Sequence, residues 1–257
     1  MKLSLIAMTK NGSWRLERML RSVGGKASEI IIGVDAATTD DTVKRARRYT
    51  PNVFLIENPQ GYIEPHIKTL VERCTGDWVL RLDDDELMST NFCLEEIQRE
   101  VLDEFDLIGF PRPWIVNIDP AYYVGTGREV WELIPQYRLM KRSAPWIFTP
   151  QIHTPGFEMR PAYEVSDMFL YHTILVDQPL EVRRRKYDFY QSLRDAAWNR
   201  DYLLDPVQLF ETGQALPCSP DRPSPQVFCY DTKTMPQPVQ CNRNMFPPLE
   251  LLRNEIL

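Results

Sequence analysis

The chain has 257 residues, of which 43% are hydrophobic and 26% charged, and its formal net charge at pH 7 is −6. These proportions are typical of a soluble globular protein with a real core, and the length favours one large α/β domain with an appendage over two independent domains. A negative net charge gives no electrostatic reason to expect a nucleic-acid partner, so none is predicted.

Cysteine usage and hydropathy suggest a compartment. The five cysteines form no C-x-x-C pair, which is poor spacing for a zinc site or a disulfide framework and indicates reduced thiols. The first apolar run, residues 3–8, is too short for a signal sequence and is better interpreted as a strand. No run reaches the length of a membrane span. We therefore expect a cytoplasmic protein without a transmembrane segment.

The first half of the chain alternates between strand-like and helical patterns. Strands are expected over residues 2–8, 29–34, 52–56 and 77–82, and helices over 13–23, 39–48, 63–74 and 88–105. Strands rich in Ile, Val and Leu with helices between them indicate a parallel sheet that is covered on both faces.

The pattern changes after about residue 106. Strands are expected over residues 106–116, 137–141 and 169–176, with an aromatic segment containing Pro and Gly between the first two. A helix is expected over residues 179–204. The chain is rich in proline from residue 206 onward, so little regular structure is expected there beyond a final helix over 248–256.

Four consecutive carboxylates, Asp83, Asp84, Asp85 and Glu86, directly follow a hydrophobic strand. Ligands of open α/β sheets bind outside the carboxyl ends of the strands, where this cluster would lie. Like charges repel, so the cluster predicts a compensating divalent cation, because Mg²⁺ and Mn²⁺ prefer oxygen ligands and keep waters and substrate phosphates. The alternative is a solvated acidic turn at the start of the next helix.

Three strand ends carry a recognisable set of motifs, namely Met8-Thr9-Lys10-Asn11, then Val34-Asp35 with the stretch through Thr42, then Asp83-Asp84-Asp85-Glu86. Together they resemble the nucleotide-binding half of the family 2 glycosyltransferases, whose GT-A fold is α/β, with a mostly parallel Rossmann-like sheet flanked by helices and a C-terminal acceptor-side region. The resemblance is strong over residues 2–90. It continues more weakly through Gln136-Tyr137-Arg138-Leu139, Trp146, His153 and Leu170-Tyr171-His172.

The resemblance implies an organisation and a reaction. Residues 1–110 would bind the nucleotide sugar, 111–205 would form the acceptor side of the same domain, and 206–257 would be a proline-rich tail. The chain would be a hexosyltransferase that moves a sugar from a nucleotide-diphosphate donor, UDP-linked in our interpretation, to a hydroxyl of a glycan, lipid-linked or protein acceptor. Transfer would be inverting and would depend on Mn²⁺ or Mg²⁺.

The resemblance also assigns roles to the acidic cluster. Asp85 would ligate the metal and so take part in catalysis, and Asp83 would face the ribose or a metal-bound water. Asp84 is given no metal role, because side chains alternate along an extended chain and Asp84 points the other way. His172 is predicted to complete the metal shell, since neutral imidazole suits Mn²⁺. Its alternative is a satisfied core histidine.

Donor binding is predicted at the first two strand ends. Asp35 would accept the imide N–H of uracil, and Thr9 and Asn11 would line the same pocket. For all three residues the alternative is an ordinary role in a turn or a helix cap.

The catalytic base is the point at which the chain departs from the resemblance. Small bacterial-type relatives have a His-Glu pair where this chain has His153-Thr154, and a threonine cannot act as a base at neutral pH. Glu158 lies four residues on, in a turn that could present it to the cleft, and is predicted as the base. Glu132 is the second candidate, more readily explained as a surface acid.

Two further groups of residues have both a structural and a functional interpretation. Aromatic side chains in the second half would pack in the core or stack on an acceptor sugar: Trp114, Tyr122, Tyr123, Trp131 and Trp146. The basic run Arg183-Arg184-Arg185-Lys186 is most simply a solvated helix face, and contact with a diphosphate or an anionic acceptor is the alternative.

Two other functions remain open. A nucleotidyltransferase shares the layout and the acidic metal site, although Thr9-Lys10-Asn11-Gly12-Ser13 is poor in Gly and Arg for its phosphate loop. A non-catalytic sugar-nucleotide-binding module would explain the missing glutamate.

Overall fold

The computed structural model describes residues 1–118, 121–124, 133–150, 162–165, 167–193, 200–211, 216–217, 227–228 and 238–239. Its first half contains β1 (Leu3–Thr9), α1 (Ser13–Val23), β2 (Glu29–Asp35), α2 (Thr42–Ala46), β3 (Val53–Ile56), α3 (Ile67–Val71), β4 (Trp78–Asp83), β5 (Glu86–Met88) and α4 (Arg99–Glu104). The second half adds β6 (Leu107–Pro111), β7 (Trp114–Ile118), β8 (Ala121–Val124), β9 (Pro135–Lys141), β10 (Ala162–Glu164), β11 (Leu170–His172), α5 (Ile174–Asp177), α6 (Leu180–Ser192) and α7 (Pro206–Glu211). Short strands β12 (Leu216–Pro217), β13 (Val227–Phe228) and β14 (Pro238–Val239) follow.

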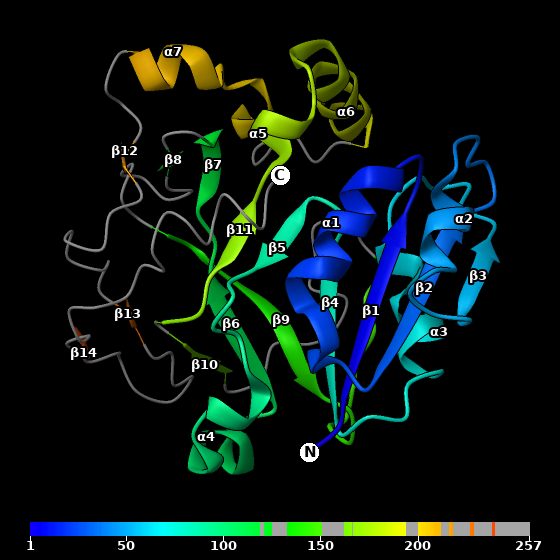
Figure 1. Cartoon of the computed structure of the whole chain (residues 1–257), viewed down its shortest axis with the longest axis vertical. Coiled ribbons are helices and arrows are strands. Elements are labelled where there is room, and N and C mark those ends of the chain that lie inside the picture. Colours follow the sequence, from blue (N-terminus) through cyan, green and yellow to red (C-terminus); the bar gives the residue numbers. More distant parts are fainter. Residues whose placement is uncertain are drawn as a thin grey trace.

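The main sheet has seven strands in the order β10-β6-β9-β4-β1-β2-β3. β1 pairs in parallel with β2 and β4, and β2 pairs in parallel with β3. β9 lies between β4 and β6 and runs antiparallel to both. The predicted α/β fold with a mostly parallel sheet is therefore confirmed. The carboxyl ends of β1, β2 and β4 meet at one edge, the upper one in Figure 1.

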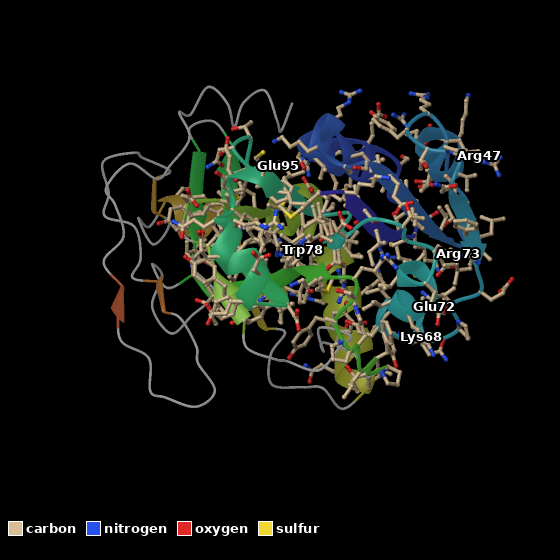
Figure 2. The ribbon with its side chains drawn as sticks, turned by 90° about the horizontal axis from the view of Figure 1, so that it is seen from below. Arg47, Lys68, Glu72, Arg73, Trp78 and Glu95 are labelled. Carbon is tan, nitrogen blue, oxygen red and sulfur yellow. The ribbon has the colours of Figure 1, made fainter. Side chains whose placement is uncertain are left out.

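Alternation along the strands divides the core into two layers. Leu3, Leu5 and Ala7 of β1 join the layer that contains the buried face of α1. Ile6 and Met8 point the other way and pack with Ile67 and Leu70 of α3. This period of two is why β1 and its neighbours are apolar on both faces and are covered on both sides by helices. Trp78, which is 2% exposed, lies in the interior, whereas Arg47, Lys68 and Glu72 lie at the margin (Figure 2).

A second sheet has the strand order β12-β8-β7-β11-β5. The chain passes from the first sheet to the second at the acidic cluster. β4 of the main sheet ends at Asp83, and β5 of the second sheet begins at Glu86. β5 pairs antiparallel with β11, so that Glu86 lies opposite His172, and His172 in turn pairs with Trp114 of β7. The four acids thus form the connection between the two sheets.

Most local predictions agree with the structure, but the expected helix over residues 88–105 is wrong. Within this range only Arg99–Glu104 is α-helical, Leu94–Glu96 forms a single 3₁₀ turn, and Met88 belongs to the strand Glu86–Met88. The cause is tertiary, because this segment pairs with β11, and Ser89 Oγ accepts a hydrogen bond from the Phe169 backbone N–H at 2.9 Å. The intrinsic helical preference of the segment was outweighed by a distant strand.

Other expected elements are also shorter or divided. The helices over 39–48 and 63–74 are α-helical only at Thr42–Ala46 and Ile67–Val71. The strand over residues 106–116 is split into β6 and β7, with Arg112 and Pro113 between them. The strand over 169–176 ends at His172 and is followed by α5. The helix over 179–204 ends at Ser192 and resumes as a single turn at Arg200–Leu203. The helix expected over 248–256 lies outside the described residues.

Candidate functional site

A cavity of about 730 Å³ opens at the carboxyl edge of the main sheet. Its floor comes from the ends of β1, β2 and β4, and its other walls come from β7, β9, β11 and α6. All six predicted site residues that the structure describes line it: Thr9, Asn11, Asp35, Asp83, Asp85 and His172. Residues from both halves of the chain therefore line one cavity.

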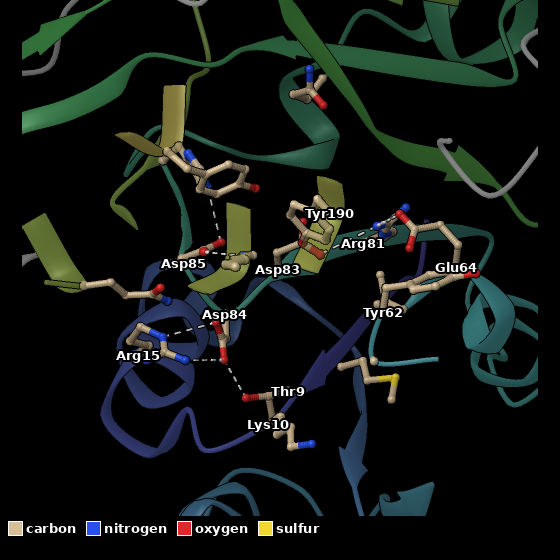
Figure 3. Close-up of a pocket in the computed structure, with 18 of the residues that line it drawn as sticks. Thr9, Lys10, Arg15, Tyr62, Glu64, Arg81, Asp83, Asp84, Asp85 and Tyr190 are labelled. Carbon is tan, nitrogen blue, oxygen red and sulfur yellow. Dashed lines mark hydrogen bonds and ion pairs between the residues drawn. The ribbon is translucent and has the colours of Figure 1, made fainter. Parts of the chain in front are cut away.

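Asp84 turns away from its two neighbours into a contact with β1 and α1. Its Oδ2 accepts a hydrogen bond from Thr9 Oγ1 at 2.6 Å and forms an ion pair with Arg15 Nη2 at 3.2 Å. Figure 3 shows Arg15 and Thr9 on either side of this carboxylate. Burial raises the pKa of Asp84, an effect that the nearby Arg15 guanidinium opposes. The expectation that Asp84 points away from Asp83 and Asp85 is confirmed.

Asp83 and Glu86 are bridged by one guanidinium across the sheet junction. Arg138 Nη2 donates to Asp83 Oδ2 at 2.7 Å and to Glu86 Oε1 at 2.6 Å. Arg81 Nη2 lies 3.7 Å from Asp83 Oδ1, and Arg112 Nη1 donates to Glu86 at 3.2 Å. Burial would raise the pKa of Asp83, but Arg138 and Arg81 hold it below its usual value.

Asp85 and His172 approach each other at the centre of the cavity. His172 Nε2 lies 3.4 Å from Asp85 Oδ1, and the imidazole meets the Trp114 ring edge-on with centroids 4.3 Å apart. The Asp85 carbonyl accepts hydrogen bonds from the Thr173 N–H at 2.9 Å and from Thr173 Oγ1 at 3.1 Å. Burial opposes ionisation of Asp85, but His172 and Lys186 hold its pKa far below the ordinary value.

The donor atoms at this point suit a divalent cation. Asp85 offers a carboxylate oxygen and His172 an imidazole nitrogen, a combination that suits Mn²⁺. The described residues bring no third Asp, Glu, His or Cys close enough to complete a site with protein ligands alone. Mg²⁺ and Mn²⁺ at nucleotide sites ordinarily keep waters and bind substrate phosphates, so two protein ligands are compatible with such a site.

The two strand ends predicted to bind the donor are already held in place by internal hydrogen bonds. Asp35, 2% exposed, accepts the Ala37 N–H at 2.8 Å and Asn58 Nδ2 at 3.3 Å. Asn11 has a φ of 48°, and its Oδ1 accepts the Thr39 N–H at 2.8 Å. Thr9 donates to Asp84, as described above. The three residues line the cavity, and their binding roles remain predictions.

Helix α6 contributes part of the cavity wall. Val182, Lys186 and Tyr190 of this helix line it, together with Tyr202 from the following turn. The Lys186 ammonium lies 3.9 Å from Asp85 Oδ2 and 5.1 Å from the centre of the Tyr202 ring. Gly61, which also lines the cavity, has a φ of 79° and lies so close to Phe189 of α6 that a β-carbon there would be 3.2 Å from the ring.

The predicted base cannot be placed. Glu158 and Glu132 lie outside the described residues, as do His153, Thr154 and Trp131. Among the predicted aromatic residues, Trp114 lines the cavity, whereas Trp146 stacks on Phe148 with centroids 5.4 Å apart and packs against the α3 side of the core. Tyr123 is buried. Only Trp114 of these three is placed to meet a ligand.

Sequence reasoning missed most of the basic and several aromatic residues of the site. They are Arg15, Arg81, Arg112, Arg138, Tyr62, Tyr190 and Tyr202, and the acid Glu64 lies with them. Lys186 was named only within the basic run, for which contact with a diphosphate or an anionic acceptor was the alternative to a solvated helix face. Arg81 lies two positions before Asp83, and because side chains alternate along a strand it reaches the same cavity face as Asp83. Nothing in the local sequence pointed to the pairing of Arg138 with Glu86.

Comparison with known families agrees with this geometry. Residues 4–165 match the family described as glycosyl transferase family 2, a match that covers more than half of the chain. The chain belongs to glycosyl transferase family 2. Members of this family commonly use a divalent metal, which fits the carboxylate and imidazole that meet at the end of β4.

Relatives support the same assignment over a shorter range. An uncharacterised glycosyltransferase of Rickettsia conorii is 36% identical over 108 residues, which is 42% of this chain and 34% of the relative. One from Rickettsia prowazekii is 37% identical over 101 residues, or 39% of this chain and 32% of the relative. The matched part of this family 2 member thus spans about a third of these relatives.

Solved structures with similar chain paths include TarS of S. aureus. TarS residues 1–349 in complex with UDP-GlcNAc give a TM-score of 0.48 at 15% identity, covering 82% of this chain and 73% of that one. The complex with UDP gives 0.46 at 14% identity, with 82% and 72% covered.

The sheet junction of this glycosyltransferase family member should depend on Arg138. Arg138→Met leaves Asp83 and the fully buried Glu86 without their shared partner, so we expect the free energy of unfolding to fall by about 3–5 kcal/mol, the usual cost of breaking a buried ion pair. Chemical denaturation measures this change.

Arg99→Met is the matched control for Arg138→Met. Arg99 pairs with Asp103 on the exposed face of α4 at 3.2 Å, and its loss should change the unfolding free energy by less than about 1 kcal/mol. Equal effects of the two substitutions would contradict a special role for Arg138.

Proposed function

We propose that the chain catalyses transfer of a hexose from a UDP-sugar to an acceptor hydroxyl, with a divalent metal and with inversion at the anomeric carbon. One observation carries the proposal: Asp35 at the end of β2 and the Asp85–His172 pair at the end of β4 line the same cavity. A nucleotide sugar has a base at one end and a diphosphate nearer the other, which matches an arrangement of separate polar groups along one cavity.

In this proposal the nucleoside lies over the ends of β1 and β2. Asp35 accepts the uracil imide N–H, and the Asn58 amide and the Lys10 ammonium, 3.5 Å from Asp35, help to orient its carboxylate. Thr9 and Asn11 line the same part of the cavity. Asp83, held by Arg138, is positioned for the ribose or for a water near the metal.

Asp85 and His172 would hold the metal in this proposal. Such an ion, when bound, stabilises the negative charge of the departing diphosphate as a Lewis acid. The chain itself fixes both ligands, because Thr173 donates to the Asp85 carbonyl and the Trp114 ring packs edge-on with the His172 imidazole. Exposure of Asp85 is only 4%, which keeps bulk water from competing for this position.

The acceptor would enter from the side of β7 and α6. Trp114, Tyr190 and Tyr202 give that part of the cavity an aromatic wall, and aromatic rings pack well on the apolar faces of sugars. A glycan, a lipid-linked sugar or a protein hydroxyl is compatible with this chemistry. Glu158 is proposed as the base that takes the hydroxyl proton.

Two alternatives are set against this proposal. In a nucleotidyltransferase the acceptor would attack a phosphorus atom of the nucleotide rather than a sugar carbon. The product released would be inorganic diphosphate rather than UDP. A non-catalytic module would bind the nucleotide sugar without turnover, and the threonine at position 154 favours it.

Among the described residues, no helix is both long enough and apolar enough to cross a bilayer.

The metal assignment predicts the behaviour of Asp85→Asn. This substitution keeps the shape of the side chain and removes its charge, so Mn²⁺-dependent binding of UDP should be lost while the fold is retained. Calorimetric titration of UDP with and without Mn²⁺ measures the effect, and thermal unfolding checks the fold. Asp103→Asn, on the exposed end of α4, is the control. Metal-dependent UDP binding that persists in folded Asp85→Asn protein would refute the assignment.

The role of Asp35 predicts nucleotide preference. UDP should bind more tightly than ADP, and Asp35→Ala should reduce this difference by tenfold or more, since a hydrogen bond to a charged group contributes about 1.5–3 kcal/mol. Competition binding with both nucleotides measures it. Glu57→Ala, an exposed carboxylate that does not line the cavity, should leave the ratio unchanged. Equal affinities of the native protein for UDP and ADP would count against the uracil contact.

The base assignment predicts that Glu158→Gln lowers kcat by at least about a hundredfold with unchanged UDP affinity, the low end for loss of a general base. Turnover of UDP-sugar in the presence of acceptor measures it, and Glu132→Gln is the comparison. If both variants keep native turnover, another group is the base or the enzyme retains configuration. The anomeric configuration of the product, determined by NMR, distinguishes these two cases.

A further inference from the structure

We propose that Lys186 of α6 binds the diphosphate of the nucleotide-sugar donor and neutralises the charge that the leaving nucleoside diphosphate acquires. The inference rests on the proposed function and adds to it a residue from the acceptor side. In the reaction, the acceptor oxygen bonds to the anomeric carbon and gives its proton to the base. The bond from that carbon to the phosphate oxygen breaks, and its electron pair stays on the phosphate.

The first argument is the position of the ammonium. Lys186 lines the cavity and its Nζ lies 3.9 Å from Asp85 Oδ2, whereas His172 Nε2 approaches the other oxygen, Oδ1, at 3.4 Å. The cation therefore lies beside the carboxylate that is proposed to hold the metal. A diphosphate bound at this point would have Lys186 within reach of its oxygens.

The second argument is that the ammonium still has hydrogen bonds to give. A separation of 3.9 Å from Asp85 is an ion pair but exceeds hydrogen-bond distance, and the structure gives Lys186 no hydrogen bond to any described residue. The guanidiniums of Arg15, Arg112 and Arg138 differ, because each donates to a carboxylate at 3.3 Å or less. An ammonium group has three N–H donors, which suit phosphate oxygens as partners.

The third argument is that aromatic rings hold the lysine in place. Nζ lies 5.1 Å from the centre of the Tyr202 ring, and Tyr202 packs against both Tyr190 and Trp114 with centroids 5.8 Å apart. A cation over an aromatic face is attracted by the ring.

The fourth argument is that the four residues of the basic run, 183–186, have different surroundings, and only Lys186 is placed to meet a ligand. Arg183 is 2% exposed, and its Nη1 donates to the carbonyls of Tyr202 at 2.6 Å and Leu204 at 2.7 Å, which fixes the turn that carries Tyr202. Arg184 and Arg185 are exposed and do not line the cavity. Of these four neighbours only Lys186 faces the ligand space, which leaves Arg185 as a control of the same charge.

The experiment compares UDP with uridine, which lacks the diphosphate. Affinities are measured for the native protein and for Lys186→Met, Lys186→Gln, Lys186→Arg and Arg185→Met, with Mn²⁺ and with a chelator, using calorimetry for UDP and NMR titration for uridine. Lys186→Met should weaken UDP binding by tenfold or more and change uridine binding by less than twofold. Lys186→Arg should recover most of the UDP affinity, and Arg185→Met should bind as the native protein does. Thermal unfolding establishes that each variant is folded, and Lys186→Gln takes the place of Lys186→Met if the latter is not.

Each other outcome overturns the inference. Native UDP affinity in a folded neutral variant would show that Lys186 does not touch the diphosphate. Equal losses for UDP and uridine would show that Lys186 only supports the cavity wall. If the native protein binds UDP in Mn²⁺ but the variants do not differ, this inference fails and the proposed function stands. If the native protein binds no UDP, the proposed function fails and takes this inference with it.

Discussion

The connection between the two sheets depends on one buried guanidinium. Asp83 ends β4 and Glu86 begins β5, and Arg138 of β9 donates to both carboxylates. Without a shared cation, two acids at this junction would repel each other and lose solvation, a cost of several kcal/mol per buried ion. With it, the turn that contains Asp84 and Asp85 has a fixed shape. The direction of the Asp85 side chain follows from that shape, and so does the position of the cavity.

Three of the four acids in the cluster form close ion pairs with arginine side chains. Asp84 pairs with Arg15, Asp83 with Arg138 and Arg81, and Glu86 with Arg138 and Arg112. Asp85 differs from the other three acids, because its contacts with His172 and Lys186 are longer, at 3.4 and 3.9 Å. The protein therefore neutralises three carboxylates internally. Asp85 has only the two longer contacts, which suits its proposed role as a ligand of a divalent cation.

The sequence predicts those features that local pattern encodes. The four parallel strands carry apolar residues on both faces, and β1, β2, β3 and β4 lie within one or two residues of their expected bounds. β5 could not be predicted in this way, since its partner, β11, is remote in the chain. Similarly, Arg138 and Lys186 enter the site through β9 and α6. A periodic pattern shows which face of an element is buried, but it does not show which other element it meets.

The two halves of the chain are joined at the cavity as well as in the sheet. Phe189 of α6 lies against Gly61 in the loop after β3, where the positive φ of the glycine and the absence of a side chain allow the approach. On the same helix Lys186 reaches Asp85, so α6 approaches both the loop after β3 and the turn after β4. Arg18 of α1 holds the adjoining α5 through Asp177 and through Thr173, at 2.8 Å from the latter. A nucleotide sugar bound beneath α6 would contact residues from both halves, so its binding energy would stabilise their association. Under the proposed function, donor binding would therefore be coupled to the positions of Tyr190 and Tyr202, because α6 and the turn that Arg183 holds carry these two residues together with Lys186.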